Sequence, residues 1–242
     1  MEGPRIEMMN PKAFSGLTEA DCIAVQRQLA ALLSDRSPLT ARTVRTAAGV
    51  DLAYWREGEE ERAVCCIVVL DCETGQVLEK RHAAGTVSFP YLPGCLAFRE
   101  LPLVVEAAAQ LSAPPDIYLF DGNGILHPRK MGLAAHASFY LDAPTAGIAK
   151  HYFRVEGASF TEPGQEAGSW SDIVKDGAVL GRALRTRRGV KPVYVSVGNR
   201  VDLDTVTALA LRLTDGESRI PRPTRLADLE THAQRRILQG GV

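Results

Sequence analysis

The sequence predicts a mixed α/β protein with a central β-sheet flanked by helices. Three consecutive segments near the start are rich in Val, Ile and Ala and are joined by short polar turns. The later segments alternate between helical and strand-like patterns, and such an order is typical of a mixed sheet. The 242 residues are 45% hydrophobic and 24% charged, which indicates a globular protein with a sizeable core. We expect a single domain over residues 1–242, with residues 1–16 as a loose lead-in.

The first predicted elements are one helix and three strands. Thr18 is a candidate N-cap, because Glu19 and Asp21 follow it in the first turn of an amphipathic pattern that ends near Asp35. Alternating or continuous apolar runs bounded by polar turns then predict strands. These strands cover residues 43–54, 62–71 and 76–86.

The second half is predicted to alternate helices and strands. A proline-rich loop at residues 90–94 precedes a helix over residues 95–111, in which Pro102 predicts a kink or a late start. A strand at 116–120, a glycine loop at 121–124, a helix at 131–141 and a strand at 144–151 follow. The polar segment 154–178 is predicted as loop, and 179–185 and 192–198 as strands. Asp202 and Thr224 are expected to cap helices over residues 203–213 and 225–238.

Charge and cysteine content narrow the class of protein. The formal net charge of −1 provides no attractive field, so a nucleic-acid partner would need a local basic face. The five cysteines include no CxxC pair, which favours buried, reduced thiols over a disulfide frame or a zinc site. No signal segment and no apolar run of membrane-spanning length is present. We therefore expect a soluble cytoplasmic protein with no membrane partner.

Three acids stand at positions where a strand or helix could aim them at a metal ion. Asp51 lies inside an apolar strand, Asp121 directly follows another, and Glu100 lies on the helix after the proline-rich loop. Asp51 or Glu100 alone is read more simply as a solvated carboxylate. Asp121 has a stronger position, because it lies where a strand ends at a glycine loop that lets a ligand approach closely. Together they offer hard oxygen ligands from separate elements, which suit Mg²⁺ or Mn²⁺. The chain has 29 acids, so many such groups of three exist. Both interpretations therefore stay open: a shared metal site, or three carboxylates that are solvated separately.

Basic residues provide candidate phosphate contacts. Lys150 ends the apolar run 146–149 and could neutralise a phosphate, or could be a strand-end lysine whose charge reaches solvent. The basic segments at residues 127–130 and 181–191 could contact phosphates without reading sequence, or could be solvated surface. The chain lacks the dinucleotide, P-loop, serine-hydrolase and zinc-protease motifs.

Eight short segments, taken in order, resemble one known family. They are GVD at 49–51, FPYLPG at 89–94, LAFRE at 96–100, DGNG at 121–124, HPR at 127–129, GIAK at 147–150, VSVG at 195–198 and PTRLA at 223–227. Their combination strongly resembles endonuclease V, a family of deoxyinosine-directed repair nucleases, over residues 18–229. The resemblance implies an RNase H-like fold and metal-dependent hydrolysis of a phosphodiester on the 3′ side of hypoxanthine in DNA, or also in RNA. Mg²⁺ is the implied cofactor, with Mn²⁺ as an alternative.

The resemblance also assigns roles to individual residues. Asp51, Glu100 and Asp121 match the metal-binding acids of the family, and Lys150 matches a lysine near the scissile phosphate. Tyr91 matches a wedge that fills the gap left by an extruded base. It stands between Pro90 and Pro93, which would hold the aromatic ring stiffly. The residues that match the lining of the base pocket are Gly94, Leu96, Gly122 and His127.

These assignments agree with the chemistry of base recognition. A base must leave the stack before a pocket can read it, and extrusion costs about a few kcal/mol. Hypoxanthine carries an oxygen where adenine carries an amino group, so a pocket donor would favour the deaminated base.

One departure from the family pattern leaves alternatives open. The family usually has a histidine after Ser-x-Gly, close to the metal site, where this chain has Asn199, and asparagine cannot titrate near neutral pH. If that histidine takes part in proton transfer, we expect slower turnover with binding largely kept. The main hypothesis is an active DNA repair nuclease that acts as a monomer. The alternatives are a lesion-binding protein with weak or no cleavage and an inosine-directed ribonuclease.

Overall fold

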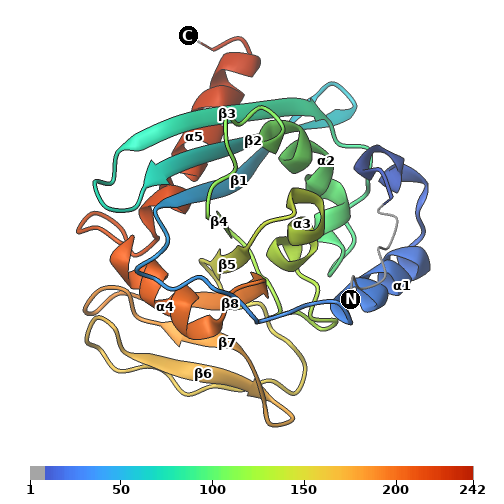
Figure 1. The fold of residues 1–242 in the computed structure, drawn as a ribbon. Coiled ribbons are helices and arrows are strands. Elements are labelled where there is room, and N and C mark those ends of the chain that lie inside the picture. Colours follow the sequence, from blue (N-terminus) through green and yellow to red (C-terminus); the bar gives the residue numbers. More distant parts are fainter. Residues whose placement is uncertain (1–8, 242) are drawn as a thin grey trace.

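An eight-stranded sheet forms the centre of the structure, a computed structural model that describes residues 9–241 (Figure 1). The strands lie in the order β3-β2-β1-β4-β5-β8-β7-β6. In chain order they are β1 (Thr46–Glu57), β2 (Glu60–Asp71), β3 (Val77–Thr86), β4 (Ile117–Phe120), β5 (Thr145–Ala149), β6 (Trp170–Lys175), β7 (Ala178–Leu184) and β8 (Val193–Asn199). The helices are the 3-10 helix η1 (Pro11–Gly16) and the α-helices α1 (Glu19–Ala30), α2 (Leu96–Ala108), α3 (Leu133–Leu141), α4 (Leu203–Arg212) and α5 (Arg222–Leu238).

The strand directions give the sheet an RNase H-like arrangement. β1, β2 and β3 form an antiparallel meander, and β4 and β5 extend it in parallel with β1. Val50 of β1 pairs with Phe120 of β4, which in turn pairs with Gly147 of β5. The residues that follow these positions therefore come to one edge of the sheet. The predicted mixed α/β fold is confirmed.

Helices cover both faces of the meander (Figure 1). Alternate residues of β2 point to opposite faces. Ile67 packs in the same apolar cluster as Phe98 of α2, whereas Val68 packs with Ala227 of α5. Because both faces of β2 are buried, its sequence reads as a continuous apolar run rather than an alternating one.

Gly49 lets α5 approach β1 closely. A Cβ atom built at this position would lie 2.0 Å from the carbonyl oxygen of Pro223, the second residue of α5. Only a residue without a side chain fits such a close approach. The contact brings the first turns of α5 against the strand that carries Asp51.

The structure differs from the sequence prediction near the amino terminus. Pro11–Gly16 forms a 3-10 helix, and its Phe14 is 1% exposed and packs edge-on against Phe98. Residues 9–16 are therefore anchored to the core and do not form a loose lead-in, while residues 1–8 lie outside the described residues. The helix α1 ends at Ala30 rather than near Asp35.

Two elements later in the chain also differ. The segment predicted as loop over 154–178 contains β6, which pairs with β7 and lies at the edge of the sheet, where an isolated bridge from Ser159 reaches its outer side. An edge strand is half-solvated, so its polar residues hide the strand pattern. The helix α5 starts at Arg222, and Thr224 donates its hydroxyl to the Pro221 carbonyl inside the helix instead of capping it.

Two expectations about the chain as a whole can be compared with the structure. All five cysteines are buried free thiols, as predicted. Within residues 9–241, no helix combines the length and the apolar character needed to cross a membrane.

Candidate active site

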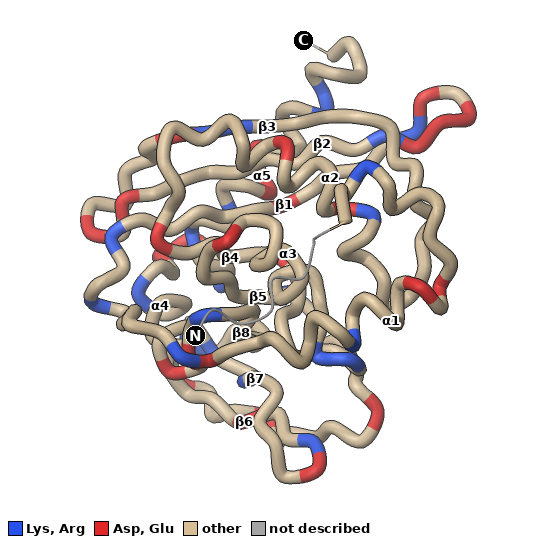
Figure 2. The backbone as a smooth tube through the Cα atoms, turned by 45° about the vertical axis from the view of Figure 1, so that its right-hand side comes forward, with Lys and Arg blue, Asp and Glu red and all other residues tan. Residues whose placement is uncertain are grey.

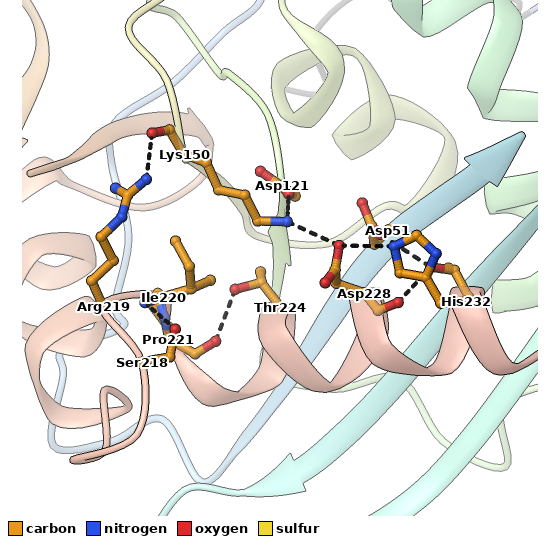
Figure 3. A network of polar contacts seen from close by, with 11 residues as sticks. Asp51, Asp121, Lys150, Ser218, Arg219, Ile220, Pro221, Thr224, Asp228 and His232 are labelled. Carbon is orange, nitrogen blue, oxygen red and sulfur yellow. Dashed lines mark hydrogen bonds and ion pairs between the residues drawn. The ribbon is translucent and has the colours of Figure 1, made fainter. Parts of the chain in front are cut away.

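Three carboxylates converge at the edge where the parallel strands end (Figure 3). Asp51 comes from β1, Asp121 follows β4, and Asp228 comes from α5, and one oxygen of each lies within 4.8 Å of the others. The parallel pairing of β1 with β4 brings the first two together, and the close approach of α5 at Gly49 adds the third. The described residues thus form a compact group of hard oxygen donors.

Sequence reasoning missed Asp228. It stands one residue beyond the segment at 223–227 that resembles the family, and it looks like an ordinary acid on an amphipathic helix. No local pattern in the sequence marks Asp228, and the contacts that tie it to the site are seen only in the structure. The Thr231 hydroxyl contacts Asp51 at 3.3 Å and donates to the Asp228 carbonyl at 2.7 Å. Asp121 could be identified because it directly follows a strand. No comparable pattern identifies an acid on a helix far along the chain.

Lys150 lies against the acidic group. It follows β5, and its Nζ atom is 2.6 Å from Asp121 and 3.0 Å from Asp228 (Figure 3). Burial alone would lower the pKa of Lys150, but the ion pairs with both aspartates outweigh burial and raise it. The lysine is therefore cationic at neutral pH. Arg219 fixes its backbone by donating to the Lys150 carbonyl at 2.8 Å.

The acidic group carries more negative charge than Lys150 balances. Burial raises the pKa of Asp51 to about 7, and the nearby Asp121 adds to the rise while Lys150 opposes it. Three carboxylates face one ammonium group, so the site as a whole favours a further cation. Carboxylate oxygens are the donors that Mg²⁺ and Mn²⁺ prefer. The residues present therefore fit a divalent metal ion.

Glu100 reaches the same region from α2. The side chain is buried, and Oε1 accepts a hydrogen bond of 2.7 Å from the Tyr54 hydroxyl. Burial raises the pKa of Glu100 to about 8, the Tyr54 hydrogen bond lowers it, and the charges of Asp51 and Asp121 raise it. The charge of Glu100 therefore interacts with the acidic group, although its oxygens lie outside the set of three that are within 4.8 Å of one another.

Asn199 lies elsewhere, so its expected place beside the metal ligands is wrong. It pairs with Thr145 at the start of β5, whereas Lys150 follows the end of that strand. Five residues of strand separate the two positions by about 16 Å. The Asn199 side chain is 4% exposed, accepts from the Ser34 N–H at 2.9 Å and donates to the Ser138 hydroxyl at 3.0 Å. It holds the chain after α1 against β8 and α3.

A cavity of about 180 Å³ lies beside the acidic group. Its lining includes five of the predicted substrate-binding residues together with others that were not predicted, among them Met131 and Phe153. The five predicted residues come from the proline-rich loop, the start of α2 and the segment that follows β4, and Phe153 follows β5: Tyr91, Gly94, Leu96, Gly122, His127 and Phe153. Pro90 and Pro93 flank Tyr91 and are exposed. Asp121 of the acidic group and Gly122 of the cavity are consecutive residues, so the two features adjoin.

Two aromatic residues at the cavity have contrasting environments. Tyr91 is 70% exposed at the tip of its loop, where its ring is available to a partner. The His127 ring is buried, which lowers its pKa to about 4, and its Nε2 atom lies 3.1 Å from the Gly94 carbonyl. The neutral imidazole stacks against Phe153 with an interplanar angle of 8°. His127 therefore forms a wall of the cavity.

The basic segment at 181–191 is only partly available to a phosphate. Arg182 pairs with Asp172 and Asp204, and Arg185 is 3% exposed and pairs with Glu162. Arg182 thus connects β7 with β6 and α4, and Arg185 connects the end of β7 with the loop that precedes β6. Basic and acidic residues are interspersed along the chain (Figure 2).

An RNase H-like sheet with clustered carboxylates, a cationic lysine and an adjoining cavity defines a metal-dependent phosphodiester hydrolase. Residues 27–229 match the family model for endonuclease V. The chain belongs to the endonuclease V family, whose members are nucleases.

Relatives support this assignment over nearly the whole chain. Endonuclease V of Bacillus subtilis is 50% identical over 226 residues, which are 93% of this chain and 95% of that protein. The crystal structure of endonuclease V from Bacillus subtilis superimposes with a TM-score of 0.91 at 47% identity, covering 97% of this chain and 99% of that one. Endonuclease V of Ciona intestinalis, in complex with a 24mer DNA containing an inosine followed by a ribo-adenosine, has a TM-score of 0.80 at 26% identity, covering 90% and 98%.

Proposed function

We propose that this chain recognises hypoxanthine in DNA and hydrolyses a phosphodiester on the 3′ side of the lesion. The observation that carries the proposal is the adjacency of Asp121, in the acidic group, and Gly122, in the cavity lining. A base held in the cavity would place its own strand beside the carboxylates. A binding site for the lesion and a centre for cutting are thus built on consecutive residues.

Asp51, Asp121 and Asp228 would hold Mg²⁺, with Glu100 contributing from α2; Mn²⁺ has the same donor preference. When bound, such an ion supplies charge neutralisation at the phosphate and activation of the attacking water. Lys150, fixed by its ion pairs, presents an ammonium group that can hold a phosphate oxygen next to the acids. Asn199 has no part in this reaction because it lies at the other end of β5.

The cavity and Tyr91 support the recognition step. The exposed Tyr91 ring can fill the stack that an extruded base leaves, which offsets part of the cost of extrusion. The stacked rings of His127 and Phe153 provide an aromatic wall for the base. Leu96 begins α2, and the first N–H groups of a helix have no partner within the helix. Such donors suit the O6 oxygen of hypoxanthine and would be left unpaired by the amino group of adenine.

DNA is the proposed substrate because the Ciona relative is in complex with a 24mer DNA that contains an inosine followed by a ribo-adenosine. Strand cleavage of an end-labelled duplex with one deoxyinosine and Mg²⁺ tests the proposal. We expect one nick on the 3′ side of the inosine, lost in Asp51→Ala and absent from the matched duplex with adenine. Inosine-selective binding without a nick would show a lesion-binding protein instead. Faster cutting of inosine in single-stranded RNA than in DNA would favour the ribonuclease.

A further inference from the structure

The carbonyl group of Gly94 is held by three donors. Nε2 of Gln26 lies 2.8 Å from the carbonyl oxygen, Nη2 of Arg129 lies 2.8 Å from it, and Nε2 of His127 lies 3.1 Å from it. The N–H of the same peptide group, which belongs to Cys95, donates to the Leu92 carbonyl at 2.9 Å. The peptide plane between the proline-rich loop and α2 is therefore fixed from both sides. Gly94 itself has a φ of +77°, a conformation that favours glycine.

Gln26 is the donor that joins two walls of the cavity. It lies on α1, 0% exposed, and the same Nε2 that binds Gly94 lies 3.2 Å from the Met131 carbonyl. Gly94 belongs to the wall formed by the proline-rich loop, and Met131 to the wall that leads into α3; both line the cavity. Oε1 of Gln26 accepts from Nε of Arg129 at 2.5 Å. One amide thus connects α1 with both sides of the cavity.

Packing alone gives no reason for a glutamine at this position. Burying an amide is costly unless its hydrogen bonds are made, and an apolar residue would pack α1 at lower cost. Two of its three partners, Gly94 and Met131, line the cavity, and the third, Arg129, itself donates to the Gly94 carbonyl. Binding geometry of this kind must be held to within about 0.5 Å to be productive.

We propose that Gln26 is a positioning residue for base recognition, which sets the width of the cavity by bridging the Gly94 and Met131 carbonyls. The inference rests on the proposed function, because the effect of Gln26 is measured through selective binding of the deaminated base. Gln26 touches neither the acidic group nor Lys150 through any of its hydrogen bonds. Its role is therefore separable from metal binding.

Gln26→Glu tests the proposal with little change of shape. The new carboxylate keeps an acceptor for Arg129 but replaces the bridging donor by an oxygen that faces two carbonyl oxygens. The measurement is the dissociation constant for the duplex with adenine divided by that for the duplex with deoxyinosine, both in EDTA; the affinity for Mg²⁺ is measured separately without EDTA. We expect the ratio to fall about tenfold, which corresponds to about 1.4 kcal/mol of discrimination, while the Mg²⁺ affinity stays as in the parent.

Two matched variants separate positioning from general damage. Gln28→Glu makes the same change on the exposed side of α1 and is expected to keep the ratio. Leu209→Ala removes a fully buried side chain from the core around α4, so it lowers stability without touching the cavity, and is also expected to keep the ratio. If Gln26→Glu does not fold, Gln26→Leu removes the bridge without adding charge and is measured instead.

The outcomes distinguish this inference from the function on which it rests. A parent protein that binds both duplexes equally would refute the proposed function. A parent that discriminates, with a folded Gln26 variant that discriminates equally well, would refute the positioning role. A loss of discrimination in Leu209→Ala as large as in the Gln26 variant would also refute it, because reduced stability would then be the cause.

Discussion

Asp51→Asn is expected to stabilise the metal-free protein while abolishing cleavage. Burial, with the charge of Asp121, raises the pKa of Asp51 from 3.8 to about 7. The folded protein therefore binds a proton at Asp51 more tightly than the unfolded chain does. The stabilisation that this proton provides is complete below about pH 4 and is lost as the pH rises through 7. A shift of about three units corresponds to about 4 kcal/mol. The cost of burying negative charge is shared among the neighbouring acids, so removing the charge of Asp51 recovers only part of it. We expect the uncharged asparagine to raise the free energy of unfolding by about half of this value, about 2 kcal/mol.

Thermal unfolding in EDTA at pH 8 measures this gain. For a domain of this size, about 2 kcal/mol corresponds to a rise of about 4–8 °C in Tm. At pH 4 the gain should disappear, since Asp51 is then protonated in the parent fold. Mg²⁺ should raise the Tm of the parent and leave that of the variant almost unchanged, because a ligand charge is missing. Asp176→Asn, an exposed turn residue, serves as the control. A variant with a lower Tm than the parent in EDTA at pH 8 contradicts the reasoning.

Four further substitutions test individual features. Tyr54→Phe removes the 2.7 Å hydrogen bond to Glu100 and should weaken Mg²⁺ binding about tenfold by calorimetry; an unchanged affinity would show that the bond is dispensable. His136→Phe should stabilise the fold by about 1–2 kcal/mol in denaturant titrations, because both ring nitrogens of this fully buried side chain lack partners among residues 9–241. Burial lowers the pKa of His136 to about 3, so the parent should lose stability as the pH falls below 6.5 and the variant should lose less; equal losses would count against this account. Asn199→His should give no faster cleavage and should lower stability by about 1–3 kcal/mol, because it breaks buried hydrogen bonds; a faster enzyme would restore a role for this position. Tyr91→Ala should leave Tm unchanged and slow the nicking of duplex DNA, and an unaffected rate would remove the wedge role.

Local patterns in the sequence predicted most of the sheet. The runs that form β1, β2 and β3 are apolar and end at polar turns, and Thr18 caps α1 through a reciprocal hydrogen-bond pair with Asp21, as expected. These features depend on residues close together in the chain. The missed strand β6 has polar residues because its free edge faces solvent, so its pattern resembles that of a loop.

The acidic site was predicted in part, for a reason that lies in its geometry. Asp51 and Asp121 are brought together by neighbouring parallel strands, and such pairing follows from strand order. Asp228 joins them through the packing of a helix more than 100 residues further along the chain, which no local pattern specifies. Asn199 was misplaced because it is the last residue of β8, which runs antiparallel to β5. The carboxyl end of β8 therefore lies at the edge of the sheet opposite the acidic group. Residues at the carboxyl ends of neighbouring strands lie at the same edge of the sheet only when the strands run parallel.

The most direct test of the account is the rate of Mg²⁺-dependent nicking of a duplex with one deoxyinosine by the Asp228→Asn variant. The parent should make one nick on the 3′ side of the inosine, and Asp176→Asn should match it. The account predicts that Asp228→Asn is slower by more than about 100-fold, with binding of the lesion retained, because a metal ligand beside an intact cavity has been lost. Cutting by Asp228→Asn at the rate of the parent would contradict the account.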